Sequence, residues 1–222
     1  MSVADLAARI AARARARPHV VGLTGSVAAG KSTLAAALAV ALAPRHVETV
    51  STDGFLLPNA TLAARDLLLR KGFPESYDRD ALEAALAALR VGPATFPVYI
   101  AYDIDPAAAR SIAAPDILLL EGLGFAPRPM GVDLLIYLDA DEADLETWFV
   151  GRFMGFWRAA AHDPQSFYAQ FRSMDETAAD VFARSVWTRI NLPNLRDHIA
   201  PLRDAADIVV RKDARHRLWL TR

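Results

Sequence analysis

Short apolar runs alternate with longer helical patterns along the whole chain. The runs typical of strands are "HVVGLTG", "HVETVS", "FPVYI", "DILLLEG", "VDLLIYLDA" and "ADIVVRK". Some are apolar at nearly every position, as strands are when both faces of a parallel sheet are covered. The pattern therefore predicts an α/β fold, with a mostly parallel sheet and helices on both faces.

The segments between these runs have helical spacing and helix-forming composition. The helices that we expect cover residues 1–17, 31–43, 59–70, 79–90, 141–160 and most of 165–190. Asn59 is expected to cap the third of them, and "NLPNL" to break the last. The final "HRLWLTR" is predicted to be an edge strand or a tail.

Composition narrows the classes of protein to consider. The 222 residues, 53% of them hydrophobic, predict one domain over 1–222, and a formal net charge of -1 gives no case for a nucleic-acid partner. The absence of cysteine excludes thiol chemistry. Without an apolar run of membrane-spanning length or a secretory signal, we expect a cytoplasmic protein with a small-molecule partner.

A phosphate-binding motif lies between the first predicted strand and the second predicted helix. "GSVAAGKS" fits G-x-x-x-x-G-K-[ST] in the context that gives the pattern its meaning. Backbone N–H groups would surround the phosphates of ATP, Lys31 would contact the β and γ oxygens, and Ser32 would bind Mg²⁺. The predicted nucleotide-binding residues of the motif are Gly25, Ser26, Val27, Ala28, Ala29, Gly30, Lys31, Ser32 and Thr33.

Two acids follow strands at the edge of the sheet where ligands of open α/β folds bind. Glu121 in "ILLLEG" is expected to hold the magnesium, directly or through water, and otherwise would cap the next segment. Asp53 in "STDGFLLPN" has two interpretations, since Asp-Gly is also a common turn pair. A kinase needs an acid there to accept the proton of an alcohol, but the residues alone leave the choice open.

Seven motifs of the chain occur in one known family in the same order. These are "GSVAAGKST", "STDGFLLPNATL", "RKGFPESYD", "PVY", "PDILLLEGL", "TWFVGRF" and "NLPNL". The chain thus resembles bacterial type I pantothenate kinases, P-loop kinases related to phosphoribulokinase and uridine kinase. The resemblance implies an ATP-dependent kinase of coenzyme A biosynthesis, and a homodimer.

The resemblance also implies roles for individual residues. Asp53 would be the catalytic base, acting with Lys31 and Arg152, and His216 would stack on adenine. Glu121 and Ser32 would be the metal-binding residues. The residues implied for the acceptor site are Asp53, Tyr99, Tyr102, Phe149, Arg152 and Asn194.

The sequence departs from the family at several positions. "PVYIAYD" is two residues shorter than the family's segment and lacks its histidine, and Phe149 replaces a tyrosine. Ala36 stands where the family has an arginine that contacts coenzyme A, and Gly124 replaces an asparagine. The first two changes remove polar contacts to the acceptor, and such losses alter specificity.

The reaction that we expect is transfer of the γ-phosphoryl group of ATP to a primary alcohol, with pantothenate as the first candidate. A related kinase for a sugar, nucleoside or other polyol is the alternative within enzymes. A P-loop protein that binds nucleotide for regulation, without catalysis, is the alternative outside them.

Overall fold

A six-stranded sheet forms the centre of the computed structural model, which describes residues 1–15, 17–100, 102–127 and 131–222. Its spatial order is β2-β5-β1-β6-β7-β8, and every neighbouring pair is parallel except the last. The strands are β1 (His19–Gly25), β2 (Val47–Ser51), β5 (Ile117–Glu121), β6 (Leu134–Asp139), β7 (Ile208–Lys212) and β8 (Leu218–Leu220). All residues of β1 and β5 are buried, as their uninterrupted apolar runs predict.

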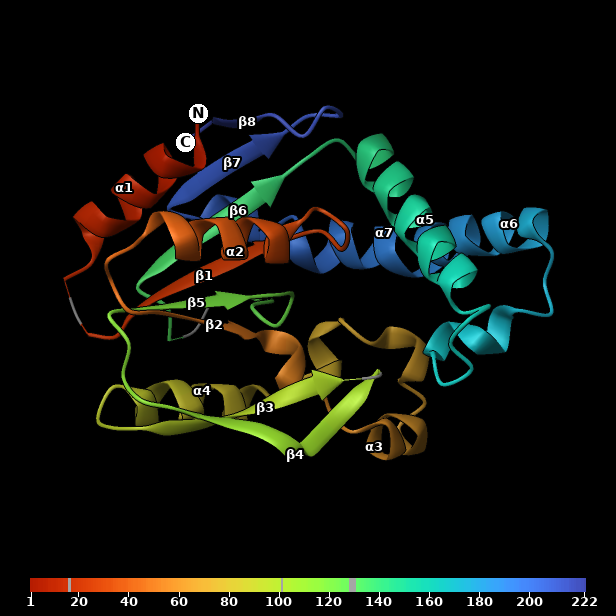
Figure 1. Cartoon of the computed structure of the whole chain (residues 1–222), viewed down its shortest axis with the longest axis horizontal. Helices are drawn as coiled ribbons and strands as arrows, with labels where there is room; N and C mark the ends of the chain where they lie inside the picture. Colours follow the sequence, from red (N-terminus) through yellow and green to blue (C-terminus); the bar gives the residue numbers. More distant parts are fainter. Residues whose placement is uncertain (16, 101, 128–130) are drawn as a thin grey trace.

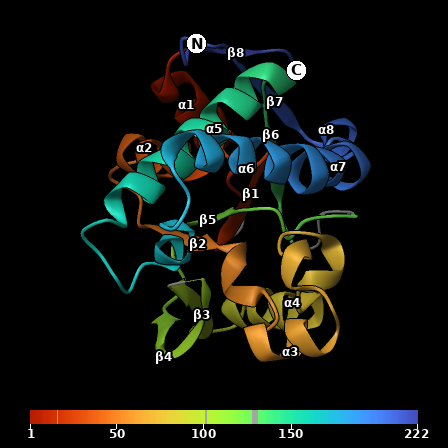
Figure 2. The ribbon, with the colours of Figure 1, turned by 90° about the vertical axis from the view of Figure 1, so that its right-hand side faces the viewer.

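Helices cover both faces of this sheet (Figures 1 and 2). Their bounds are α1 (Val3–Arg13), α2 (Lys31–Ala41), α3 (Asn59–Ala64), α4 (Arg79–Leu89), α5 (Glu142–Ala159), α6 (Glu176–Val186), α7 (Leu192–Asn194) and α8 (Leu202–Ala205). α2 packs on β1, β2 and β5, whereas α8 contacts β6 from the opposite side. The α/β architecture with a mostly parallel sheet is confirmed. No helix in the described ranges has both the length and the apolar character needed to span a membrane.

A second, two-stranded sheet lies beside the edge strand β2 (Figure 1). It pairs β3 (Ala94–Ile100) with β4 (Asp103–Ile112) in antiparallel register. The sequence predicts β3 but not β4, because "DIDPAAARSI" has a proline, three alanines and charges in place of an apolar run. Most of β4 is exposed or half-buried, so little burial exists to leave a pattern.

Two helices are shorter than expected. The first ends at Arg13 rather than residue 17, and α3 ends at Ala64 rather than Arg70. After α3, Asp66 adopts a left-handed conformation with φ of 56°, which a continuing helix cannot contain. The predicted capping role of Asn59 is also wrong, because Pro58 is the cap and the Asn59 amide donates to the Tyr102 carbonyl at 3.1 Å.

The C-terminal helical region differs most from its prediction. Residues 165–175 contain only a short turn (Phe167–Phe171), and α6 begins where the Asp175 carboxylate accepts from the Ala178 N–H. "NLPNL" does not break the helix, which continues through two π turns, Trp187–Asn191 and Leu195–Ile199. Pro193 lies in α7 between these two π turns.

Candidate active site

The phosphate loop connects β1 to α2 and has the backbone shape that anion binding requires. Gly25 and Gly30 have φ of 139° and 96°, and a Cβ on Gly25 would lie 2.3 Å from the Leu138 carbonyl oxygen. Gly30 is the N-cap of α2, so the loop delivers free N–H groups and the positive end of the helix dipole to one place. This geometry suits a phosphate group.

Lys31 is enclosed at the start of α2. Its Nζ donates to the carbonyl oxygens of Gly25 and Ser26 at 3.1 and 2.9 Å. Burial lowers its pKa to about 8, and the charge of Arg152 acts in the same direction, whereas Glu121 and Asp53 raise it. Glu121, Asp53 and Arg152 are therefore all close enough to influence Lys31.

Glu121 ends β5 next to the phosphate loop. Burial raises the pKa of its carboxyl group, while Lys31 and the hydroxyls of Ser32 and Ser51 lower it. A serine hydroxyl beside a carboxylate at the phosphate loop is the donor set with which P-loop enzymes hold Mg²⁺. Among the residues described, no cluster of three or more acidic, histidine or cysteine side chains offers another metal site. Ser32 and Glu121 thus fit magnesium bound mainly through phosphate and water.

Asp53 lies in a 3₁₀ turn (Thr52–Phe55) directly after β2. The Tyr77 hydroxyl donates to its Oδ1 at 3.0 Å, and the Ser51 hydroxyl accepts from its N–H at 3.2 Å. The next residue is glycine because a Cβ on Gly54 would lie 2.1 Å from the Pro97 carbonyl oxygen of β3. The Asp-Gly pair is therefore a turn, and the turn also fixes the direction of the carboxylate.

A cavity of about 700 Å³ extends from the phosphate loop along α5 to the end of β7. Sequence-predicted residues on its wall are Ala28, Gly30, Lys31, Ser32, Thr33, Arg152 and His216. His216 adopts φ of 61° and packs its ring against Trp148, with the centroids 4.9 Å apart. The two rings form an aromatic wall of the cavity, which suits a purine base.

The tyrosines implied for the acceptor lie on the other side of Asp53. Tyr99 and Tyr102 contact each other edge to face at 6.3 Å, and the Tyr102 and Tyr168 hydroxyls are 2.5 Å apart. Lys71 donates to the Tyr99 hydroxyl at 3.2 Å and to the Tyr102 carbonyl. Burial lowers the pKa of Lys71, and Asp103 and Asp53 oppose this. Ala101 of "PVYIAYD" is outside the described residues.

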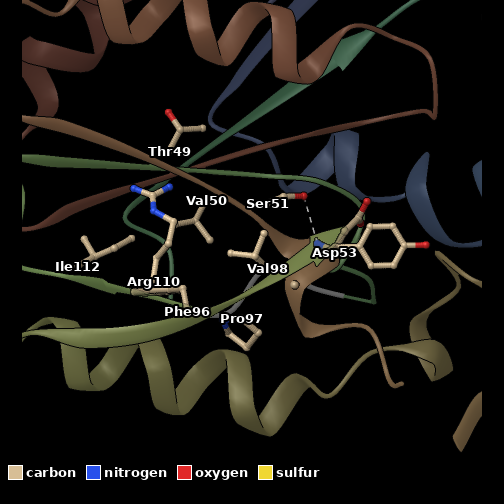
Figure 3. Close-up of a pocket in the computed structure, with 11 residues that line it drawn as sticks. Thr49, Val50, Ser51, Asp53, Phe96, Pro97, Val98, Arg110 and Ile112 are labelled. Carbon is tan, nitrogen blue, oxygen red and sulfur yellow. Dashed lines mark hydrogen bonds between the residues drawn. The ribbon is translucent and has the colours of Figure 1, made fainter. Parts of the chain in front are cut away.

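A second cavity, of about 280 Å³, borders Asp53 and Tyr99 along the outer edge of β2 (Figure 3). Figure 3 shows Asp53 and Ser51 at one end and Arg110 and Ile112 at the other. Arg110 is paired there with Glu48 at 2.7 Å. Asp53 thus borders open space on the side of Tyr99.

Phe149 and Asn194 are more buried than the other predicted acceptor residues. Phe149 is 9% exposed and packs against Trp187 at 5.9 Å, and Asn194 donates through Nδ2 to the Gly72 carbonyl at 2.9 Å. The Oδ1 of Asn194 is buried with no partner among the described residues. Asn194 therefore joins the C-terminal helix to the loop that carries Lys71.

Sequence reasoning missed Tyr77, Lys71 and Trp148. All three lie inside quoted motifs, "RKGFPESYD" and "TWFVGRF", so the motifs were recognised without a role for these side chains. The available signal for Lys71 was the scarcity of lysine, since only three of the 25 Lys and Arg residues are lysines. No comparable signal marks Tyr77, because its partner Asp53 is 24 residues away.

Comparisons with known proteins agree with this geometry. No protein-family model matches the chain. The pantothenate kinase of Sorangium cellulosum is 44% identical over 90% of this chain and 70% of its own length, and that of Streptococcus pyogenes is 40% identical over 91% and 71%.

Solved structures with low sequence identity share the fold. The D-glycerate 3-kinase of Cryptococcus neoformans superposes with a TM-score of 0.60 at 12% identity, covering 98% of this chain and 96% of its own. Phosphoribulokinase from Rhodobacter spheroides gives 0.54 at 14% identity, covering 88% and 70%. The chain has a phosphate loop after β1 and an acid, Glu121, at the end of the neighbouring strand β5. Together with relatives that are 40 to 44% identical, these features show that the chain belongs to the pantothenate kinase family of ATP-dependent P-loop kinases.

Proposed function

We propose that this protein transfers the γ-phosphoryl group of ATP to the primary hydroxyl of pantothenate. The observation that supports it most directly is the approach of Asp53, Glu121 and Arg152 to Lys31, with Lys31 and Arg152 on the wall of one cavity and Asp53 on the wall of the other. Identity of 40 to 44% to curated pantothenate kinases supports this acceptor.

Each side chain has a distinct task in the proposed reaction. Asp53, oriented by Tyr77, accepts the hydroxyl proton as the oxygen attacks the γ-phosphorus. Lys31 and Arg152 stabilise charge on the transferred group, and the loop N–H groups hold the β-phosphate. Ser32 and Glu121 would hold Mg²⁺, which supplies positive charge to the β and γ oxygens when bound.

The nucleotide and acceptor are assigned to different cavities. ATP would occupy the 700 Å³ cavity, with its base at His216 and Trp148 and its phosphates at residues 25–33. Pantothenate would approach Asp53 from the side of Tyr99 and Tyr102, with Phe149 and Asn194 supporting that wall. In-line transfer would require the acceptor oxygen to approach the γ-phosphorus from the side opposite the leaving group, and separate cavities for the two substrates are compatible with this.

One observation favours a second acceptor class, a sugar, nucleoside or other polyol. Phe149 presents no hydroxyl where the family has tyrosine, and its ring packs on Trp187. Together with the shortened "PVYIAYD" segment, this change removes contacts that would select pantothenate, so the pocket discriminates less strongly against another alcohol.

ADP release measured with purified protein, ATP and Mg²⁺ tests the acceptor. Pantothenate is expected to stimulate ADP release and to gain the mass of one phosphoryl group, whereas sugars and nucleosides leave the rate at background. Stimulation by a polyol and none by pantothenate would assign the second acceptor class.

Asp53→Asn tests the base. The amide cannot take a proton, so kcat should fall by about 10² or more. Asparagine is close in shape to aspartate and retains the oxygen bonded by Tyr77 and the N–H bonded by Ser51. Nucleotide affinity should therefore stay within about twofold of the wild-type value. Turnover at the wild-type rate would refute the role of Asp53.

Localisation and assembly are further parts of the proposal. We place the protein in the cytoplasm as a homodimer without a nucleic-acid partner, on the formal charge of -1 and the family resemblance. Size-exclusion chromatography with light scattering measures the assembly, and a mass near 24 kDa, that of the single chain, would refute the dimer.

A further inference from the structure

Two of the three lysines of this chain line the 700 Å³ cavity, and the third contacts Tyr99 on the wall of the other cavity. Lys31 is in the phosphate loop, Lys71 faces the acceptor tyrosines, and Lys212 is the last residue of β7. The other 22 of the 25 Lys and Arg residues are arginines. Lysine differs from arginine in its compact charge and flexible stem, so a chain that strongly prefers arginine retains lysine where that shape matters.

Lys212 has no role in the function proposed above, yet it occupies the wall of the nucleotide cavity. It is 9% exposed, and its Nζ donates to the Ala29 carbonyl of the phosphate loop. The same Nζ lies 3.9 Å above the centre of the Trp148 ring, whose other neighbour is His216. Lys212 therefore touches both the phosphate-binding end and the aromatic end of the cavity.

The space around this ammonium group explains why it is not a guanidinium. A Cβ on Gly30 would lie 3.1 Å from Lys212 Nζ, so the loop backbone already encloses the charge closely. A planar guanidinium would need more room than this contact leaves.

Across residues 1–15, 17–100, 102–127 and 131–222, Lys212 forms no ion pair, in contrast to its neighbour Arg211. Burial lowers its pKa, and Asp144 is the acid that opposes this. A buried cation held only by a carbonyl and an aromatic face is costly unless an anionic ligand completes its environment.

We propose that Lys212 is a nucleotide-positioning residue, which ties the phosphate loop to the aromatic wall and adds positive charge between the phosphates and the base. The inference rests on the proposed use of this cavity by ATP, but not on the identity of the acceptor. Because this contact is made equally in the ground state and the transition state, it sets nucleotide affinity rather than kcat.

Direct nucleotide binding to Lys212→Met, measured by calorimetry with ADP and Mg²⁺ and no acceptor, tests the inference. The Kd for ADP is expected to rise about tenfold, the effect of losing one charge-assisted contact. KM for ATP should rise in parallel, with kcat within about twofold of wild type. Lys212→Gln keeps a donor for the Ala29 carbonyl and should also lose affinity, which provides a second variant if the first does not fold.

Arg211→Met is the matched control, since Arg211 is the preceding residue of β7 and pairs with Asp139 and Asp141 away from the cavity. It should leave the Kd for ADP unchanged. An unchanged Kd in both Lys212 variants, or an equal loss in Arg211→Met, would overturn the inference. If wild-type protein binds ADP but does not phosphorylate pantothenate, only the proposed acceptor fails; if it binds no ADP, both proposals fail.

Discussion

At the scale of single residues, Tyr77 illustrates how this site holds Asp53, the proposed base. The Tyr77 side chain is buried, and burial together with the charge and hydrogen bond of Asp53 raises its pKa well above the ordinary value. The hydroxyl therefore keeps its proton over the working pH range and always donates to Asp53 Oδ1. A donor fixed in this way restricts the carboxylate to one orientation.

Tyr77→Phe removes this donor while keeping the ring. We expect kcat to fall about tenfold, the value of one hydrogen bond to a charged group, with nucleotide affinity unchanged. Steady-state kinetics with saturating ATP measure the effect. Tyr137→Phe is the control, because Tyr137 is equally buried but lies on β6, away from the base. Equal losses in both variants would show general destabilisation instead.

At the scale of elements, the predictability of each segment depends on its burial. β1 has the bounds predicted from "HVVGLTG", and β5 falls within "DILLLEG", because both are covered on both faces. β4 was missed because it is an exposed edge strand held to β3 by backbone bonds, which sequence patterns do not record. The predicted helix break at "NLPNL" was wrong because the π turns accommodate Pro193.

Within the site, residues were predictable where they are contiguous in the sequence, and not where distant segments meet. The phosphate loop was predictable because its residues are contiguous and each has a chemical reason for its spacing. The alternatives for Asp53 could not be decided from "TDG", since the Tyr77 hydroxyl and the close approach of Pro97 come from distant segments. Trp148 had no role assigned from the sequence, because only the fold brings His216 and Lys212 against its ring.

β1 carries a pH-sensitive residue at its beginning. His19 is 4% exposed, and both ring nitrogens are buried without a hydrogen-bond partner among the described residues. Burial lowers its pKa, against the opposing charge of Asp133, so the folded protein favours neutral His19. The unfolded chain binds the proton more readily, so this contribution to stability is complete above about pH 6.5 and is lost as pH falls below that value.

His19→Asn should reduce this dependence. Urea denaturation at pH 7 and pH 5 is expected to show a smaller loss of unfolding free energy for the variant than for wild type. His46→Asn is the control, since the His46 side chain is exposed just before β2. An identical pH dependence in wild type and His19→Asn would contradict the assignment.

At the scale of the whole molecule, nucleotide binding and proton binding are coupled through Lys31. The free protein holds Lys31 with a pKa of about 8, lowered chiefly by burial. Phosphate groups favour the charged lysine, so binding above pH 8 must be accompanied by uptake of a proton. Without ligand, the lowered pKa makes the fold gain stability as pH rises from about 8 to the unfolded value near 10.4. Rising pH above 8 thus weakens ADP binding but stabilises the ligand-free fold, so the two effects can be measured separately.

ADP-induced stabilisation should therefore decline with rising pH. At pH 7, ADP at 100 times its Kd adds about 2.7 kcal/mol to the free energy of unfolding. One proton taken up per ADP weakens affinity about tenfold per pH unit above pH 8, so the same ADP concentration at pH 9 adds about 1.4 kcal/mol less. The measurement is the difference in unfolding free energy with and without ADP, which cancels the ligand-free change. Lys31→Met, whose side chain carries no charge, should show a small stabilisation that is equal at both values of pH. A wild-type stabilisation that is the same at pH 7 and pH 9 would place the phosphates out of contact with Lys31.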